Sequence, residues 1–168
     1  PIQQMLLGAG GVVDTKPYID DVFSTYVYTG NGSYPRSITN GIDLSGEGGM
    51  VWMKSRSRPY GHQILDTARG LTKSLESNAA YGNQDGLYAK LSSWNNNGYT
   101  MIAPSSTDVQ NGNNDEIAHW IFRKSPGLFD CVEFSGNGVA GRTISHSLAS
   151  TPGMMLLKRT DRDGDDWY

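Results

Sequence analysis

The chain repeats part of itself, and this internal repeat constrains its fold more than any other feature. Residues 28–32, reading YTGNG, return as FSGNG at 134–138, 106 positions later. Residues 49–54, reading GMVWMK, return as GMMLLK at 153–158, an offset of 104, so the second copy is shorter by two residues between the motifs. Internal repeats indicate a chain built from copies of one structural unit. We expect one complete unit followed by roughly the first third of another.

Asn-Gly pairs separate short apolar runs along the chain, starting at residues 31, 40, 97, 111 and 137. Each pair can supply the two positive φ angles of a tight hairpin turn. The chain also holds 21 glycines, and a glycine inside a helix costs about 1 kcal/mol relative to alanine. We therefore predict an all-β fold, an antiparallel β-sandwich or jelly-roll repeat with an extended N-terminal arm.

Strand-sized runs recur about every 10–14 residues, with turn residues between them. The run at 50–54 is almost continuously apolar, which predicts a central strand covered on both faces. Along 117–122 the side chains alternate, which places Ile117, His119 and Ile121 on one face. We predict strands at 22–28, 36–44, 50–54, 62–66, 87–91, 99–102 and 117–122, with a turn at 94–98.

These patterns divide the chain into three parts. Residues 1–24 form an arm, residues 25–129 form the first β-sandwich repeat, and residues 130–168 begin a second, incomplete repeat. Roughly a third of a repeat cannot bury its own hydrophobic face. Either a longer protein continues the second unit, or its strands complete the sheets of the first.

The arm is too short and too rich in glycine to form a core. A frayed terminus is one interpretation. We favour a segment that becomes ordered by laying apolar side chains on a partner protein. Its start lacks the basic stretch of a secretory signal, and Pro1 suits a chain whose initiator methionine was removed. The expected anchor residues are Met5, Leu6, Leu7, Val12 and Val13.

The formal net charge of −3 gives no strong field that would favour nucleic acid. No stretch approaches the roughly 20 apolar residues of a membrane span, so we expect no membrane insertion. The single cysteine, Cys131, excludes an internal disulfide framework, and we expect it to be a buried structural thiol.

Acidic residues near the end of the chain are the one candidate for a metal site. Asp161, Asp163 and Asp165 could offer oxygen ligands to calcium, although the alternative is an acidic hairpin tip. The three histidines are far apart and are interpreted as structural. We predict no cofactor. We also expect that the protein is not an enzyme, because cleavage of a glycosidic bond needs two carboxylates flanking that bond, and the chain has no alternating Glu and Asp along one strand face.

Aromatic residues in or beside turns suggest a different kind of site. Tyr60, Trp94 and Tyr99 are followed or preceded by asparagine, glycine or proline-rich turns. Aromatic rings next to amide and carboxylate groups can stack on sugar rings and bond their hydroxyls. These three residues are the candidate glycan-binding set, and ordinary packing at the rim of the sandwich is the alternative.

Five motifs carry a resemblance to a known family, at 28–32, 49–54, 66–70, 97–100 and 120–127. They resemble the concanavalin-like β-sandwich repeat domain of tailed-bacteriophage tail fibre and appendage proteins, of the kind found in cyanophages. The resemblance implies a homotrimer in a virion tail appendage, bound to tail or adaptor and nozzle proteins and made in the host cytoplasm without a signal peptide. It carries no catalytic signature.

The resemblance and the arm lead to one expected function and one alternative. We expect a structural virion protein, the N-terminal anchoring part of a phage tail fibre involved in host attachment. Because the second copy in similar proteins runs on past its Gly-Asp-Trp segment, we also expect that the protein continues beyond residue 168. The alternative is a carbohydrate-binding module that recognises host surface glycans.

Overall fold

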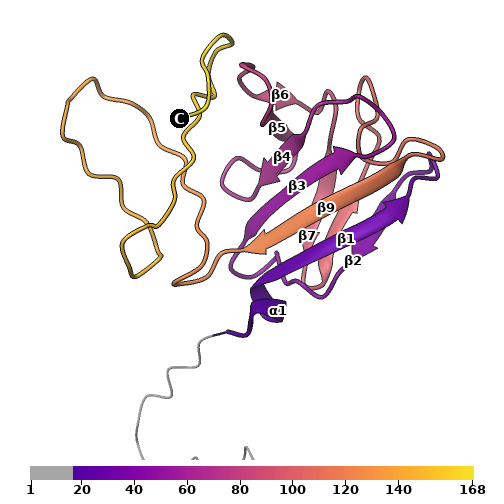
Figure 1. The fold of residues 1–168 in the computed structure, drawn as a ribbon, viewed down its shortest axis with the longest axis horizontal. Coiled ribbons are helices and arrows are strands. Elements are labelled where there is room, and N and C mark those ends of the chain that lie inside the picture. The colour runs from indigo at the N-terminus through magenta and orange to yellow at the C-terminus, as the bar shows by residue number, and fades with distance from the viewer. Residues whose placement is uncertain (1–16) are drawn as a thin grey trace, which may run out of the picture.

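The computed structural model describes residues 17–168, which contain two antiparallel sheets packed face to face (Figure 1). This confirms the prediction of an all-β antiparallel sandwich. The expected anchor residues, Met5, Leu6, Leu7, Val12 and Val13, lie outside the described residues. A short helix, α1 (Ile19–Val22), leads into the first strand. No helix of the described residues is long and apolar enough to cross a membrane.

The two sheets differ in size. The larger has six strands, in the order β1 (Phe23–Thr29), β9 (Glu116–Arg123), β3 (Gly49–Ser55), β4 (Gln63–Asp66), β5 (Lys73–Glu76) and β6 (Gln84–Asp85). The smaller has three strands, in the order β2 (Arg36–Thr39), β8 (Gly98–Met101) and β7 (Leu91–Asn95). In Figure 1 the strands β1, β9 and β3 lie in front of β2 and β7.

Strand β3 occupies a central place in the larger sheet, between β9 and β4, as predicted for its apolar run. Its residues alternate between buried and half-buried, so Val51 and Met53 point into the sandwich and Trp52 points outward. The prediction that both faces are covered is therefore wrong. The outward face carries two large aromatic groups. Trp52 lies opposite Trp120 of β9, and their ring centroids are 6.1 Å apart.

The core lies between the two sheets. Strand β9 contributes Ile117, His119 and Ile121 to the buried side, as the alternation predicts. Burial of apolar side chains on this scale is the main favourable term in folding. The hydrophobic core cluster consists of Ile38, Ile42, Leu44, Val51, Met53, Leu65, Ala89, Leu91, Tyr99, Met101, Val109 and Ile121.

The predicted strand at 87–91 and the predicted turn at 94–98 are wrong. Strand β7 starts at Leu91 and runs to Asn95, and a two-residue turn at 96–97 joins it to β8. Residues 86–88 instead bond to the loop that follows β8, with Ser106 N–H donating to the Leu87 carbonyl at 2.9 Å. The predicted strand at 36–44 is likewise shorter and ends at Thr39.

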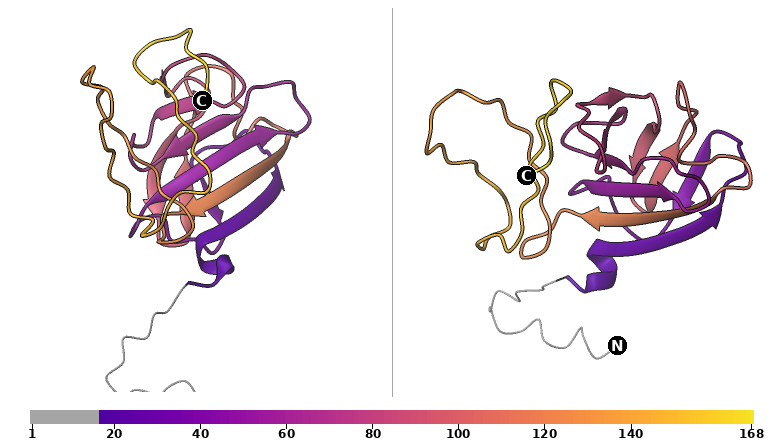
Figure 2. Two further views of the ribbon diagram at one scale, coloured as in Figure 1. Left: turned by 60° about the vertical axis from the view of Figure 1, so that its left-hand side comes forward. Right: turned by 45° about the horizontal axis from the view of Figure 1, so that its top comes forward.

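Residues 130–168 contain no strand, and they lie beside the sandwich rather than within it (Figure 2). Of the two alternatives for the second copy, completion of the first unit's sheets is therefore wrong. A few hydrogen bonds hold the end of this segment against the loop around β6. The Trp167 indole donates to the Glu76 carbonyl at 2.9 Å, and Asn83 N–H donates to the Thr160 carbonyl at 2.9 Å.

Candidate functional site

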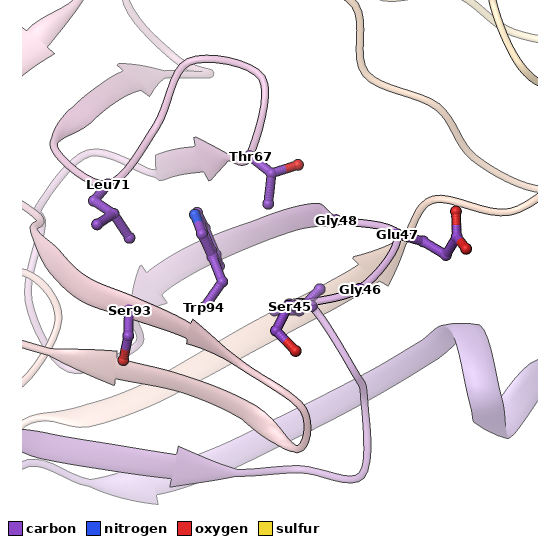
Figure 3. Close-up of a pocket in the computed structure, with 9 residues that line it drawn as sticks. Ser45, Gly46, Glu47, Gly48, Thr67, Leu71, Ser93 and Trp94 are labelled. Atoms are coloured by element: carbon purple, nitrogen blue, oxygen red, sulfur yellow. The ribbon is translucent and has the colours of Figure 1, made fainter.

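An open cavity of about 490 Å³ lies at the side of the sandwich where β7 forms the edge of the smaller sheet (Figure 3). Three parts of the chain form its walls: the loop before β3, the segment between β4 and β5, and strand β7. This volume is in the range of small-molecule binding sites. The lining residues are Leu44, Ser45, Gly46, Glu47, Gly48, Thr67, Leu71, Ser93 and Trp94.

Trp94 is the largest group in the cavity. Figure 3 shows its ring rising from β7 between Leu71 and Thr67. The ring is half-buried and packs against the core cluster. Within residues 17–168 its indole N–H has no hydrogen-bond partner, whereas the indole of Trp52 donates to His62 Nδ1 at 3.2 Å. The cavity therefore offers a partly exposed aromatic face and a free donor.

Strand β7 positions the other walls through backbone hydrogen bonds at both its ends. Leu91 N–H donates to the Leu71 carbonyl at 2.9 Å, and Leu44 N–H donates to the Asn95 carbonyl at 2.9 Å. These bonds hold residues from two distant loops beside Trp94. The cavity is consequently part of the folded framework rather than a gap between loose loops.

Asp43 fixes the loop that forms the rim of the cavity. Its Oδ1 accepts hydrogen bonds from the Ser45 hydroxyl at 2.8 Å, the Ser45 N–H at 2.9 Å and the Gly46 N–H at 3.1 Å. The bond from the Ser45 hydroxyl, followed by that from Gly46, holds the pKa of Asp43 below its usual value. The ionised carboxylate therefore stays in place as the acceptor that shapes this turn.

Gly48 allows the rim and the far wall to approach each other closely. Its φ is +81°, and a Cβ at this position would collide with Thr67 Oγ1. Thr67 Oγ1 in turn accepts a hydrogen bond from Gly49 N–H at 3.0 Å. A residue with a side chain would be strained here and would push Thr67 away.

The structure separates the three predicted glycan-binding residues. Trp94 lines the cavity, as just described. Tyr60 is half-buried elsewhere on the core, and its carbonyl accepts a hydrogen bond from Lys54 Nζ at 2.7 Å. The prediction for Tyr99 is wrong, because its side chain is 0% exposed and bonds to His119 Nδ1 inside the sandwich. A buried ring cannot stack on a sugar.

Tyr99 instead belongs to a buried polar network. His119 Nε2 lies 3.2 Å from the Tyr28 hydroxyl, and the Tyr28 hydroxyl donates to the Gln110 carbonyl. Burial, with a smaller effect of Arg36, lowers the pKa of His119 to about 3. Burial also raises the pKa values of Tyr28 and Tyr99. These groups stay neutral near pH 7, and their role is to satisfy one another inside the core.

The calcium candidate is wrong, because arginines and a backbone N–H already bind its three carboxylates. Asp161 accepts from Arg159 Nε at 2.6 Å, and Asp165 accepts from Arg162 Nε at 2.7 Å. These arginines lower the pKa values of Asp161 and Asp165. Asp163 accepts a hydrogen bond from Gly82 N–H at 2.8 Å. No metal-binding group of three ligands occurs among the described residues.

Sequence reasoning found Trp94 but missed its neighbours. Leu71, Thr67 and the rim loop join the site only through packing across the fold. The glycine run at 46, 48 and 49 was the available signal, since glycines next to a strand often mark a close backbone approach. Among the nine lining residues the only carboxylate is Glu47, which points away from Trp94 in Figure 3.

Comparison with known proteins gives one match. The family described as "Domain of unknown function (DUF7483)" matches residues 19–168, across both the sandwich and the segment that follows it. No curated protein matches the chain, and no solved structure matches it. The chain belongs to the DUF7483 family.

Proposed function

We propose that this protein is a structural virion protein, the anchoring part of a phage tail fibre, whose sandwich attaches to host surface glycans at the Trp94 cavity. The tandem arrangement of the sequence supports the structural part of the proposal. A sandwich followed directly by a second copy of its own motifs suits an appendage built from serial units.

The observation that carries the attachment part is the cavity itself. Sugar rings have apolar C–H faces that pack on an indole ring, and their hydroxyls need donors and acceptors nearby. The cavity supplies the Trp94 face, an indole N–H that has no partner among residues 17–168, and the hydroxyls of Ser45 and Thr67. Its one ionisable lining residue is Glu47, so neutral sugars fit the cavity better than acidic ones.

Glycan binding is tested with the purified full chain on a glycan array, followed by titration of the best ligand. Trp94→Ala is expected to weaken binding about 30-fold, since loss of an aromatic anchor costs about 2 kcal/mol. Trp94→Phe keeps an aromatic face and should lose much less. Tyr81→Ala removes an exposed aromatic outside the cavity and should change nothing. Absence of any glycan ligand, or equal binding by the Trp94→Ala variant, would argue against attachment at this cavity.

The same variants separate the two parts of the proposal in phage particles. Deletion of residues 1–16 removes the apolar anchor residues and leaves every described residue in place. This variant is expected to be missing from purified virions, whereas the Trp94→Ala variant should be incorporated normally and should slow adsorption to host cells. Incorporation of the deletion variant at the normal level would contradict the anchoring role.

A further inference from the structure

In the described part of the chain, strand β1 is an edge strand of the larger sheet. Among residues 17–168 its only strand partner is β9. Its sequence, FSTYVYT, contains no charged residue and no proline. Proteins usually protect such edges with lysine, proline, bulges or short strands, because an open edge can pair with another strand. Arg36 Nη1 donates to the Thr29 carbonyl at 3.2 Å and covers the end of β1. The rest of this seven-residue edge has none of these devices and is suited to strand addition.

Ahead of Thr29, the backbone of β1 points groups outward that have no partner among residues 17–168. Beyond the strand's end, Gly30 N–H donates to the Asp115 carbonyl on the side of β9. Because antiparallel residues alternate in direction, the backbone groups of Tyr28 and Tyr26 also face β9, and those of Val27 and Thr25 face the open edge. The Val27 side chain is 63% exposed on the outer face of the sheet.

A segment suited to such an edge lies elsewhere in the chain. Residues 153–158 are the second copy of β3, and both runs begin with Gly-Met and end with lysine. The four apolar residues between, Met154 to Leu157, are 49–78% exposed and belong to no strand. Among residues 17–168 their backbone pairs only at Leu157, which exchanges two hydrogen bonds with Tyr168. Residues 153–158 thus have the sequence of a central strand but lie in neither sheet.

Geometry prevents this segment from reaching β1 of its own chain. Thr160 and Asp163 bond to Asn83 and Gly82, which adjoin β6 at the opposite edge of the sheet. Six strands about 4.8 Å apart place the two edges roughly 24 Å from each other. Residue 158 is two positions from Thr160, and two residues span at most about 7 Å.

We propose that residues 153–158 of one copy add to β1 of a second copy as an extra strand of its larger sheet. The contact joins two different surfaces. After one contact forms, the first copy still has its β1 edge and the second copy still has its residues 153–158 for further contacts. Such a head-to-tail contact forms a ring where the rotation closes, and an open filament where it does not. A three-membered ring would give the homotrimer expected for a fibre. The proposal does not depend on whether the Trp94 cavity binds glycan.

Disulfide trapping tests the proposed pair of surfaces directly. In a Cys131→Ser background, one batch of protein carries Val27→Cys and another carries Leu156→Cys. Leu156 is the counterpart of Trp52, whose side chain lies on the same outer face as Val27. Because a disulfide needs Cα atoms within about 7 Å, cross-linked dimers are expected when the two batches are mixed. Met154→Cys, mixed with Val27→Cys in the same way, detects a pairing register that is shifted by two residues.

Each batch alone is the control and should remain largely uncrosslinked. Disulfide dimers of the Val27→Cys protein alone would show that β1 pairs with itself, and would overturn the proposal. Absence of cross-links in the mixtures with both Leu156→Cys and Met154→Cys would overturn it as well.

Sedimentation of the full chain tests the same contact without cysteines. The unmodified protein is expected to associate as its concentration rises, and Val27→Lys and Leu156→Asp should each shift it at least tenfold toward the monomer. Thr39→Lys, on the exposed edge strand β2 of the smaller sheet, should leave association unchanged.

A mixture of the two blocked variants gives the sharpest result. The Val27→Lys copy still has its strand, and the Leu156→Asp copy still has its edge, so the mixture should form dimers and nothing larger. A protein that stays monomeric at every concentration would overturn the proposal, including the case in which residues 1–16 occupy the β1 edge of their own chain.

Discussion

Replacing Tyr99 with alanine is expected to lower the free energy of unfolding by about 3–5 kcal/mol, the usual cost of deleting a large buried aromatic side chain. Tyr99 is fully buried and lies opposite Ile38 of β2 and Trp94 of β7. Its loss leaves a cavity in the smaller sheet and removes the hydroxyl bonded to His119. Urea unfolding followed by circular dichroism measures the change.

Two further variants separate packing from hydrogen bonding. Tyr99→Phe keeps the ring and leaves His119 Nδ1 without its partner, so it should cost about 1–3 kcal/mol. Tyr81→Ala, at a half-exposed tyrosine in a loop, should stay within about 0.5 kcal/mol of the parent. If Tyr99→Ala behaved like Tyr81→Ala, the register that turns Tyr99 into the core would be wrong.

Acid gives a second readout of the same network. Burial lowers the pKa of His119 to about 3 in the folded protein, whereas an unfolded histidine titrates near about 6.5. The unfolded state therefore takes up this proton first as the pH falls. The stability contributed by neutral His119 is complete above about pH 6.5 and is lost progressively toward about pH 3. His119→Gln should flatten this part of the pH dependence.

Replacing Arg69 with methionine is the second large expected loss, about 3–5 kcal/mol, because it leaves a buried carboxylate without its cation. Arg69 Nη2 lies 2.5 Å from Asp66 Oδ2, and the two side chains are 5% and 10% exposed. The guanidinium also donates to the carbonyls of Lys73 and Ile64 and to Asn83 Oδ1. It thus ties β4, β5 and the loop before β6 together.

The ion pair of Arg56 and Glu116 provides the matched control. Its atoms are 3.8 Å apart, and the side chains are 54% and 60% exposed. Arg56→Met should therefore change the free energy of unfolding by no more than about 1 kcal/mol. Equal losses for Arg69→Met and Arg56→Met would mean that Asp66 reaches solvent, contrary to the structure.

The sequence was sufficient to predict the sheets where side chains alternate clearly. The alternation along 117–122 placed Ile117, His119 and Ile121 on one face, and the structure buries all three. The almost continuous apolar run at 50–54 predicted a strand, although it did not show that one face of β3 stays half-buried. Strand β7 was missed because Trp94 and Asn95 were grouped with the Asn-Gly turn. A local sequence pattern shows where a turn lies but not how many residues the turn contains. Here the turn contains only two residues, at 96–97.

The candidate site shows the same limit more strongly. Trp94 could be proposed from its own surroundings in the sequence, but Leu71 and Thr67 join it only because β7 bonds to the segment after β4. Tyr99 has similar neighbours in the sequence, but its side chain is fully buried whereas that of Trp94 is half-buried. Its burial depends on its register with Ile38 and Trp94, which no local motif specifies.

The internal repeat also predicted only part of the structure. It identified residues 153–158 as a second β3, yet it could not say whether a strand partner was present. In the structure the two copies differ in environment, because β3 lies between β9 and β4 whereas its copy lies outside both sheets. One sequence pattern thus has two outcomes, and neighbouring strands decide between them.

Hydrogen exchange of the full chain, read by mass spectrometry, measures whether the two copies of the motif differ in backbone pairing. In dilute solution the peptides that cover β3 should be strongly protected, while those that cover residues 153–158 should exchange within seconds, because almost none of their backbone groups are paired. At concentrations where copies associate, residues 153–158 and the edge of β1 should gain protection together. Equal protection of both copies of the motif in the dilute monomer would contradict the placement of residues 153–158 outside the sheets.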